Sequence, residues 1–206
     1  MRRKLILTVS LAAAFFTLLL FLLSTHQAQP LDLRVDNTVK ELYNPLVATI
    51  VTMLTHLNSP PALMVWSLLA GGLLLLERHI HEILYFLGTV WGAALLTTIV
   101  KHLVQRLRPE ERLVEIHSYS FPSWHSTTSA ALAIAVWILW IRPLPASSLK
   151  RLLTTLIFLW PLLIGCSRIY LHAHWLSDVL AGWSLGVAVA GTTTLLYFHD
   201  RSGGKV

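Results

Sequence analysis

The sequence predicts an all-α integral membrane protein, a bundle of six transmembrane helices with a short amphipathic helix at its outer face. Hydrophobic residues make up 55% of the 206 positions, and the mean hydropathy is +0.64. Charged residues make up only 13%, against about 25% in a soluble domain. Long apolar runs alternate with short polar segments, which is the pattern of a multi-pass membrane protein rather than of a soluble enzyme.

The first apolar run covers residues 5–23 and carries no charge. At 1.5 Å per residue it is long enough to cross a hydrocarbon core of about 30 Å. Arg2, Arg3 and Lys4 precede it, which predicts a cytoplasmic N-terminus. A cleavable signal peptide is the alternative, but the run exceeds the roughly 7 to 15 apolar residues of a signal core, which favours a retained anchor.

The remaining elements follow in order. Residues 24–45 are polar and are expected outside the membrane, and the run 46–57 is too short to span and precedes two prolines, so we expect an interfacial helix there. Five further spans are expected, at residues 62–76, 83–100, 126–141, 152–164 and 175–198. Six spans place both termini in the cytoplasm. Without an internal repeat or a linker, residues 1–206 are expected to form one domain.

The net charge restricts the expected partners, and the cysteine content restricts the expected disulfide and redox chemistry. The formal charge of +6 is explained by basic cytoplasmic loops and by sites for anionic lipid headgroups, so we expect membrane lipids and no nucleic acid as partners. The single Cys166 excludes an intramolecular disulfide and is expected to be a buried small residue without a redox role. The sequence leaves open whether the protein is a monomer or a homodimer.

Three polar stretches fall at helix ends on the expected outer side of the membrane, and the first and third carry fixed cations. In 101–109, Lys101 and Arg108 are seven residues apart, so two helical turns would place both on one face. In 167–178, Arg168 precedes His174 and Asp178, which are four apart and would pair on one helix face. Three cations converging in an apolar protein predict a site for a multiply charged anion such as phosphate.

The second stretch, 122–125, begins a helix and adds Ser123 and His125. Ser123 and the backbone N–H groups of the helix start would complete a phosphate cradle. A histidine paired with a carboxylate keeps one ring nitrogen free to attack, whereas an unpaired histidine can deliver a proton to a leaving group. These residues predict phosphoryl transfer through a phosphohistidine.

The three stretches together resemble the signature of the type 2 phosphatidic acid phosphatase family, a superfamily shared with vanadium haloperoxidases and glucose-6-phosphatase. Lys101 is followed after six residues by Arg108-Pro109, then come Pro122-Ser123-x-His125, and then Ser167-Arg168, five residues, His174, three residues, Asp178. The resemblance implies that His174 is the nucleophile, that Asp178 orients it and that His125 is the general acid. The phosphate ligands it implies are Lys101, Arg108, Ser123 and Arg168, with Trp124 in the same substrate-binding group.

The family acts without a metal or cofactor, and its membrane members act on lipid phosphates or diphosphates. We therefore expect a bacterial inner-membrane phosphatase whose site faces the outside. Undecaprenyl diphosphate is the first substrate choice, and phosphatidylglycerol phosphate or phosphatidic acid the second. Two alternatives stay open: a lipid phosphotransferase that hands the phosphate to an acceptor such as lipid A, and a lipid-phosphate binding scaffold without turnover.

Three positions depart from the family pattern. Trp124 and His172 stand where the family has glycine, and Leu176 stands where proline is common. Glycine lets a backbone approach a phosphate closely, so Trp124 raises the question of altered or lost activity.

Other polar or small residues have simpler explanations. Arg106 and Arg112 match no motif position and are interpreted as solvated flanking charges, and His102 and His172 as headgroup-facing or supporting residues. The pairs His79/His81 and His172/His174 do not share a helix face, which argues against a zinc site. Two small-residue pairs, Gly88/Gly92 and Gly182/Gly186, are expected to pack the helices that carry them.

Overall fold

In the computed structural model, residues 2–203 are described, and over this range the chain is helical, as expected. Residues 1 and 204–206 of the expected single domain lie outside the described residues. The elements are, in order, α1 (Arg2–Ser24), α2 (Gln29–Glu41), α3 (Pro45–His56), α4 (Pro60–Leu76), α5 (Ile80–Val104), α6 (Trp124–Val136), η1 (Trp137–Ile141), α7 (Ser148–Tyr170) and α8 (Leu176–Gly203).

Within residues 2–203, five helices are long and apolar enough to cross a membrane unaided: α1, α5, α6 with η1, α7 and α8. The sixth expected span lies in α4, which reaches a span's length only together with α3. These two helices are bent by 43° at their junction, where Ser59 caps α4 and Pro60 begins it. The expected membrane helix bundle is thus confirmed, with five candidate spans among the described residues and a sixth if the bent pair of α3 and α4 crosses as one.

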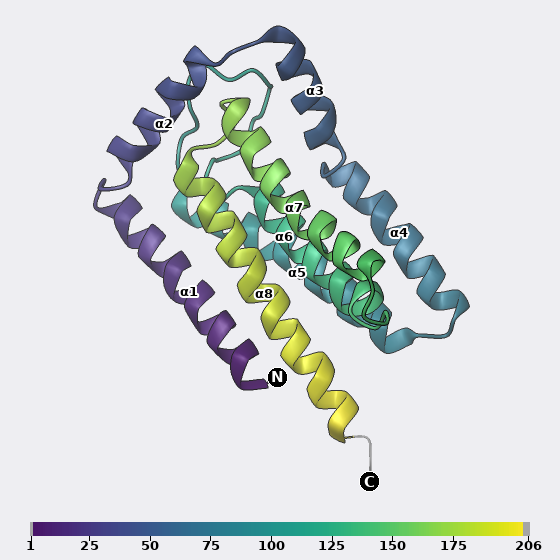
Figure 1. Cartoon of the computed structure of the whole chain (residues 1–206). Helices are drawn as coiled ribbons and strands as arrows, with labels where there is room; N and C mark the ends of the chain where they lie inside the picture. The colour runs from purple at the N-terminus through teal and green to yellow at the C-terminus, as the bar shows by residue number, and fades with distance from the viewer. Residues whose placement is uncertain (1, 204–206) are drawn as a thin grey trace.

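The long helices run between two ends of the bundle, and each end carries its own set of connections (Figure 1). Helices α2 and α3 and the loop 105–123 lie at one end, together with the connection between α7 and α8. The start of α1, the end of α8 and the turn between α4 and α5 lie at the other end. Both described chain ends are therefore on the side opposite the three motif regions.

Helix α2 was not expected, because residues 24–45 carry no apolar periodicity. The side chains that α2 buries are the carboxylates Asp32 and Asp36, one turn apart, rather than a hydrophobic stripe. Pro30, in the first turn of the helix, supports the helix start because it has the required φ and lacks an N–H that would be unpaired there. The buried face of this helix is therefore marked by carboxylates and not by apolar residues.

The glycines of α8 allow it to pack closely on α6. A Cβ on Gly182 would lie 2.7 Å from the backbone oxygen of Ser123, and one on Gly186 would lie 2.4 Å from that of Thr127. The prediction for this pair is confirmed. It is wrong for Gly88 and Gly92, because a Cβ at either position would meet no described atom within 4 Å.

The expectation for Cys166 is also wrong, because its side chain is exposed on α7. The neighbouring Gly165 faces inward instead, where Trp183 of α8 fills the space that a side chain would need. A thiol on the outer surface of a membrane span is compatible with lipid, and this explains why a small apolar residue there need not be buried.

Candidate active site

A cavity of about 920 Å³ opens at the end of the bundle that carries α2 and α3. Its walls come from the α3–α4 junction, the end of α5, the loop 105–123, the start of α6 and the end of α7. Six of the eight predicted site residues line it: Lys101, Arg108, Trp124, His125, Arg168 and His174. Segments far apart in sequence therefore converge on one cavity, as the three motifs predict.

Lys101 and Arg108 meet in the cavity, but not because they share a helix face. Helix α5 ends at Val104, and Gln105 takes a left-handed conformation with φ 53° that turns the chain. Lys101 remains in the last turn, where its Nζ donates to the carbonyl oxygens of Tyr119 and Ser120 at 2.6 and 3.0 Å. The helical-spacing argument was wrong, and the loop brings Arg108 back to the site.

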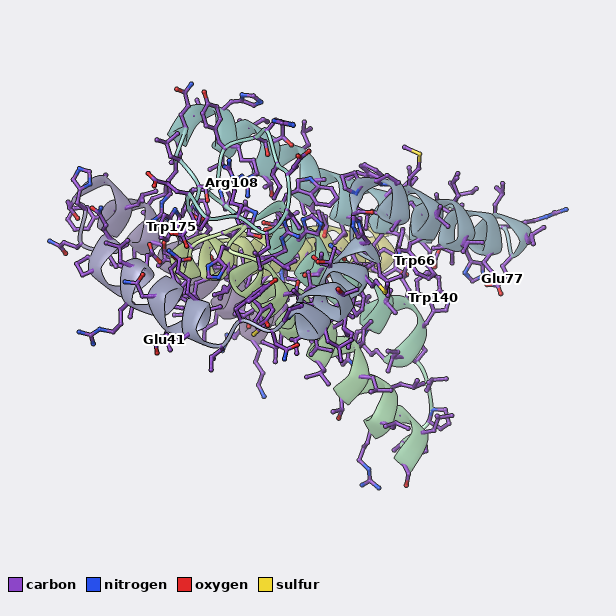
Figure 2. All side chains as sticks on the ribbon, turned by 90° about the horizontal axis from the view of Figure 1, so that it is seen from above. Glu41, Trp66, Glu77, Arg108, Trp140 and Trp175 are labelled. Carbon is purple, nitrogen blue, oxygen red and sulfur yellow. The ribbon has the colours of Figure 1, made fainter. Side chains whose placement is uncertain are left out.

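Arg108 is fixed by several carbonyl groups and lies against the predicted nucleophile. Its Nε donates to the carbonyl of Ser118 at 2.7 Å, and Nη2 donates to that of Tyr119 at 2.9 Å. Its Nη1 donates to the Ala173 carbonyl and lies 2.9 Å from Nε2 of His174 (Figure 2 shows Arg108 within the loop). A guanidinium has no acceptor, so Nε2 accepts this bond and the proton of a neutral His174 is on Nδ1.

That tautomer places the Nδ1 proton toward Asp178. Nδ1 of His174 is 3.4 Å from Oδ2 of Asp178, which is fully buried. The pair forms without a shared helix face, because α8 begins at Leu176 and His174 lies in the turn before it. The expected pair lies at ion-pair distance, although Nδ1 forms no hydrogen bond within the described residues and the helical reason for the pairing was wrong.

Electrostatics favours a neutral His174. Burial lowers its pKa well below the usual 6.5, and the charges of Arg108, Lys101 and Arg168 lower it further, while the backbone of Ser120 opposes the shift. Burial also lowers the pKa of Arg108 to about 10, so its guanidinium stays charged at neutral pH. The cavity thus combines a neutral imidazole with a fixed cation.

Arg168 supplies a third cation that is only partly used by the protein. Its Nη1 donates to Thr55 of α3 at 3.2 Å, and its buried Nε has no hydrogen-bond partner among the described residues. Buried donors are normally paired, so an unpaired guanidinium N–H that lines a cavity indicates a place for an anionic ligand.

Ser123 has a different place from the one expected. It is the N-cap of α6, its hydroxyl oxygen accepts from the Ser126 hydroxyl at 2.9 Å, and its backbone N–H donates to the carbonyl of Asp178. Its side chain is buried and is not among the residues that line the cavity. In this structure Ser123 therefore begins α6 and joins it to α8.

Trp124 and His125 form the first turn of α6. Their rings meet edge to face with centroids 5.5 Å apart, and Trp124 packs against the hydrophobic cluster around Phe86 and Leu132. The backbone of Trp124 does not adopt a positive φ. The tryptophan thus needs none of the conformational freedom of the glycine that it replaces, and its ring forms part of the cavity wall.

His172 does occupy a glycine-type conformation, with φ 49°. Its ring Nδ1 lies 2.7 Å from Oδ1 of Asp36 on α2, and Asp36 also pairs with Lys40 at 3.3 Å. The departure from the family's glycine therefore has a visible counterpart, a buried histidine–carboxylate pair that joins α2 to the turn before α8. This agrees with the interpretation of His172 as a supporting residue.

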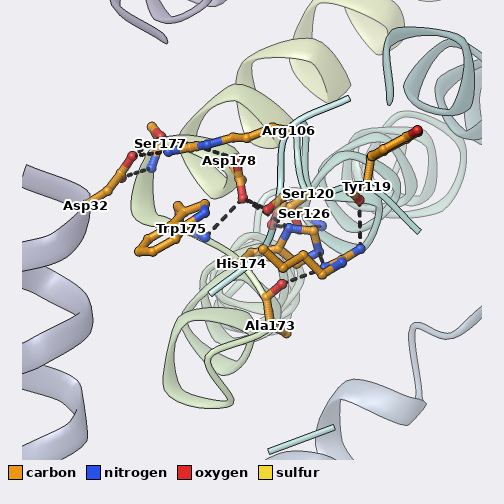
Figure 3. A network of polar contacts seen from close by, with 12 residues as sticks. Asp32, Arg106, Tyr119, Ser120, Ser126, Ala173, His174, Trp175, Ser177 and Asp178 are labelled. Carbon is orange, nitrogen blue, oxygen red and sulfur yellow. Dashed lines mark hydrogen bonds and ion pairs between the residues drawn. The ribbon is translucent and has the colours of Figure 1, made fainter. Parts of the chain in front are cut away.

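Arg106 was wrongly interpreted as a solvated charge. Its Nη1 lies 2.6 Å from Oδ1 of Asp178, and its Nη2 lies 2.6 Å from Oδ2 of Asp32 (Figure 3). The spacing of two residues between Arg106 and Arg108 gave no reason to expect this, and Asp32 is too distant in sequence for any motif to link them. Arg112, by contrast, is exposed at the cavity rim.

Among residues 2–203, no group of three His, Cys, Asp or Glu side chains is arranged to hold a metal ion. Of the six charged side chains that line the cavity, five are basic and one, Glu115, is acidic, which suits an anionic substrate.

Two curated proteins that this chain resembles are phosphatases. Phosphatidylglycerophosphatase B of Bacillus subtilis is 29% identical over 175 residues, which cover 84% of this chain and 86% of that protein. Decaprenylphosphoryl-5-phosphoribose phosphatase of Mycobacterium tuberculosis is 30% identical over 130 residues, covering 60% of this chain and 67% of that protein.

Solved structures extend the similarity to the whole bundle. The crystal structure of a transmembrane PAP2 type phosphatidylglycerolphosphate phosphatase from Bacillus subtilis matches with a TM-score of 0.85 and 26% identity, over 96% of this chain and 98% of that one. Aquifex aeolicus LpxE matches with a TM-score of 0.63 and 19% identity, over 80% and 94% of the chains, which shows a common fold. The sequence pattern of the PAP2 superfamily matches residues 82–202, which include all three motifs, and the chain therefore belongs to the PAP2 superfamily.

Proposed function

We propose that this membrane lipid phosphatase removes the terminal phosphate of phosphatidylglycerol phosphate through a phosphohistidine on His174. The observation that carries the proposal is the contact between Arg108 Nη1 and His174 Nε2, 2.9 Å apart in a cavity that Lys101 and Arg168 also line. The sequence match and the structural match to phosphatidylglycerophosphate phosphatase of Bacillus subtilis each cover most of this chain, which supports this substrate over undecaprenyl diphosphate, the first choice from sequence.

Substrate binding would use the three cations. A phosphate monoester carries up to two negative charges, and Arg108 and Arg168 offer planar N–H groups while Lys101 adds a point charge. Arg108 would transfer its Nη1 hydrogen bond from His174 to a phosphate oxygen. The same movement frees the lone pair of Nε2 and places phosphorus next to it.

In the first chemical step, His174 Nε2 attacks phosphorus and the bond to the lipid oxygen breaks. His125 protonates that oxygen, and the lipid alcohol is released. The cations stabilise the charge on the three equatorial oxygens as the transition state forms. Asp178 stabilises the imidazolium that develops when Nε2 becomes bonded, because its Oδ2 lies 3.4 Å from the protonated Nδ1 nitrogen.

In the second step, His125, now neutral, removes a proton from water, and the hydroxide attacks the phosphohistidine. The N–P bond breaks, inorganic phosphate leaves and His174 becomes neutral again. Burial and the neighbouring cations lower the pKa of His174 and so make its neutral form a good leaving group. The proton taken from water restores the protonated His125 that began the cycle, so both histidines are back in their starting protonation states.

The decisive experiment measures phosphate release by the purified protein from phosphatidylglycerol phosphate, phosphatidic acid and undecaprenyl diphosphate, with and without EDTA. We expect the highest kcat/KM with phosphatidylglycerol phosphate and no loss with EDTA. Equal phosphate release by wild type and the His174→Ala variant would refute the residue assignment. A preference for the diphosphate would refute the proposed substrate and leave the site intact.

Phosphate transfer to another lipid is the competing reaction. A labelled phosphate donor supplied with and without lipid A distinguishes the two, because hydrolysis yields labelled inorganic phosphate alone. Label in the acceptor lipid would assign the protein as a phosphotransferase.

We also propose that the protein lies in the bacterial plasma membrane with its site facing outward and both termini in the cytoplasm. The basic residues at the start of α1 support this orientation, as does the position of both described chain ends opposite the cavity. In a Cys166→Ser background, an impermeant thiol reagent added to cells should label Glu115→Cys and should not label Ala146→Cys. The reverse pattern would place the site in the cytoplasm.

A further inference from the structure

The carboxylate of Asp178 is held through both of its oxygens by groups other than His174. Oδ2 accepts from the hydroxyl of Ser120 and from the backbone N–H of Trp175, the latter at 3.0 Å. Oδ1 accepts from Nη1 of Arg106 at 2.6 Å. Of these donors, Arg106 is the one that brings a full charge to the carboxylate, and Figure 3 shows it on the side of Asp178 away from His174.

Arg106 connects this carboxylate to α2. Its second terminal nitrogen, Nη2, donates to Oδ2 of Asp32 at 2.6 Å, so one guanidinium joins two carboxylates from α2 and α8. Asp32 is itself anchored to the start of α8, because it accepts from the N–H of Ser177 at 2.9 Å and from its hydroxyl at 2.6 Å. The resulting network is buried, with 2% of Asp32 exposed.

The balance of charge explains why two carboxylates are needed. A guanidinium paired with Asp178 alone would draw the negative charge of that carboxylate away from the Nδ1 proton of His174. Asp32 shares the positive charge of Arg106, so Asp178 keeps more of its charge for the histidine. Arg106 on Oδ1, together with Ser120 and the Trp175 N–H on Oδ2, fixes the rotation of the Asp178 side chain, which a single donor would not do.

We infer that Arg106 is a positioning residue for the His174–Asp178 pair and that Asp32 of α2 sets the position and the effective charge of Arg106. This rests on the proposed function, since it assigns a role toward the proposed nucleophile. It makes α2, which lies outside the residues matched by the family pattern, a working part of the active site.

Arg106 also lines the cavity, so direct phosphate binding is the competing role. Both terminal nitrogens are already bonded to carboxylates at 2.6 Å, and a phosphate would have to displace one of them. Arg108 and Arg168 differ in this respect, because neither is paired with a carboxylate in the network. Loss of a phosphate ligand would raise KM, whereas loss of a positioning residue lowers kcat.

The test is a double-mutant cycle on the full-length protein with phosphatidylglycerol phosphate in mixed micelles. Arg106→Gln should lower kcat about 100-fold with little change in KM, since a displacement of about 1 Å at the reacting groups has that effect. Asp32→Asn should lower kcat by less, and the double variant should equal Arg106→Gln rather than show the product of the two losses. Arg106→Lys should keep a higher kcat than Arg106→Gln, because lysine retains the positive charge. It should not reach the wild-type kcat, because lysine lacks the two terminal nitrogens that bond both carboxylates.

Asp36→Asn is the matched control, since it lies one turn along α2 and contacts His172 instead of Arg106. It should keep kcat near wild type, and thermal unfolding of every variant reports any general loss of folding. Multiplicative losses in the double variant, a rise in KM without a fall in kcat, or an equal loss with Asp36→Asn would each overturn the inference. His174→Ala, assayed in parallel, tests the proposed function separately.

Discussion

A methyl group at Gly182 is predicted to separate α8 from α6 and so damage the site from a distance. Its Cβ would lie 2.7 Å from the Ser123 backbone oxygen, and ordinary contact begins at 3.4 Å, so the helices must part by about 0.7 Å. A backbone oxygen at a helix start cannot turn aside as a side chain can. Overpacking of this kind costs about 1 to 3 kcal/mol.

Two measurements should show the effect of Gly182→Ala. The apparent Tm in detergent should fall by about 2 to 12 °C, which is the cost above converted for a chain of this length. The kcat should fall on the order of 10- to 100-fold, because Asp178 lies one turn before Gly182 and its carbonyl accepts from the N–H of Ser123 at 2.9 Å.

Gly88→Ala is the matched control, since it makes the same substitution on α5 with no described atom within 4 Å of the new Cβ. Alanine is the better helix former by up to about 1 kcal/mol, so its Tm should stay level or rise. If both variants behaved alike, the close approach of α6 and α8 at Gly182 would not be what holds the site together.

Three more predictions concern the surroundings of the proposed nucleophile, His174. His172→Gly should lower the apparent Tm although glycine suits φ 49°, because the lost bond to the buried Asp36 outweighs a left-handed penalty of about 1 to 2 kcal/mol; a rise would contradict this. Asn58→Ala should lower kcat and Tm together, since Asn58 donates to Thr128 at 2.9 Å and to the carbonyl of His125 at 3.2 Å; unchanged values would show that His125 needs no such support. After correction for substrate ionisation, kcat/KM should not fall as the pH drops through 6.5, because burial and the neighbouring cations keep His174 neutral at that pH. A kcat/KM that falls to half of its maximum at pH 6.5 would refute the lowered pKa of His174.

The motif residues could be predicted from sequence, but the geometry that unites them could not. The motifs grouped Lys101, Arg108 and His174 at one site, and all three line the same cavity. The reason offered, shared helix faces, failed because α5 ends three residues after Lys101 and α8 starts two residues after His174. Helix ends depend on local capping and on tertiary contacts, which spacing alone does not specify.

Arg106 and Asp32 show a different limit. They are 74 positions apart, and their pairing depends on how α2 lies against the bundle. Helix α2 is itself hidden from hydrophobic periodicity, because the side chains it buries are carboxylates. An arginine near the end of a membrane span is ordinarily a headgroup contact, so only the three-dimensional arrangement shows that this one is nearly buried between two acids.

Trp124 gives the last prediction, because its ring is the feature that most clearly departs from the family pattern. The ring packs against the hydrophobic cluster, meets His125 edge to face and lines the cavity, while its backbone is unstrained. We therefore expect Trp124→Gly to lower kcat for long-chain lipid phosphates and to lower the Tm, because His125 loses a wall of its pocket and α6 gains a poor helix former near its start.

Trp124→Phe is the control that keeps an aromatic ring at this position, and it should retain most of the activity. A water-soluble short-chain phosphate separates the two contributions of the ring. If the tryptophan holds the lipid at the bilayer boundary, Trp124→Gly should lose more activity with the long-chain substrate than with the short one. A gain in turnover with both substrates would mean instead that the ring obstructs the phosphate, and that glycine in the family leaves room which this protein lacks.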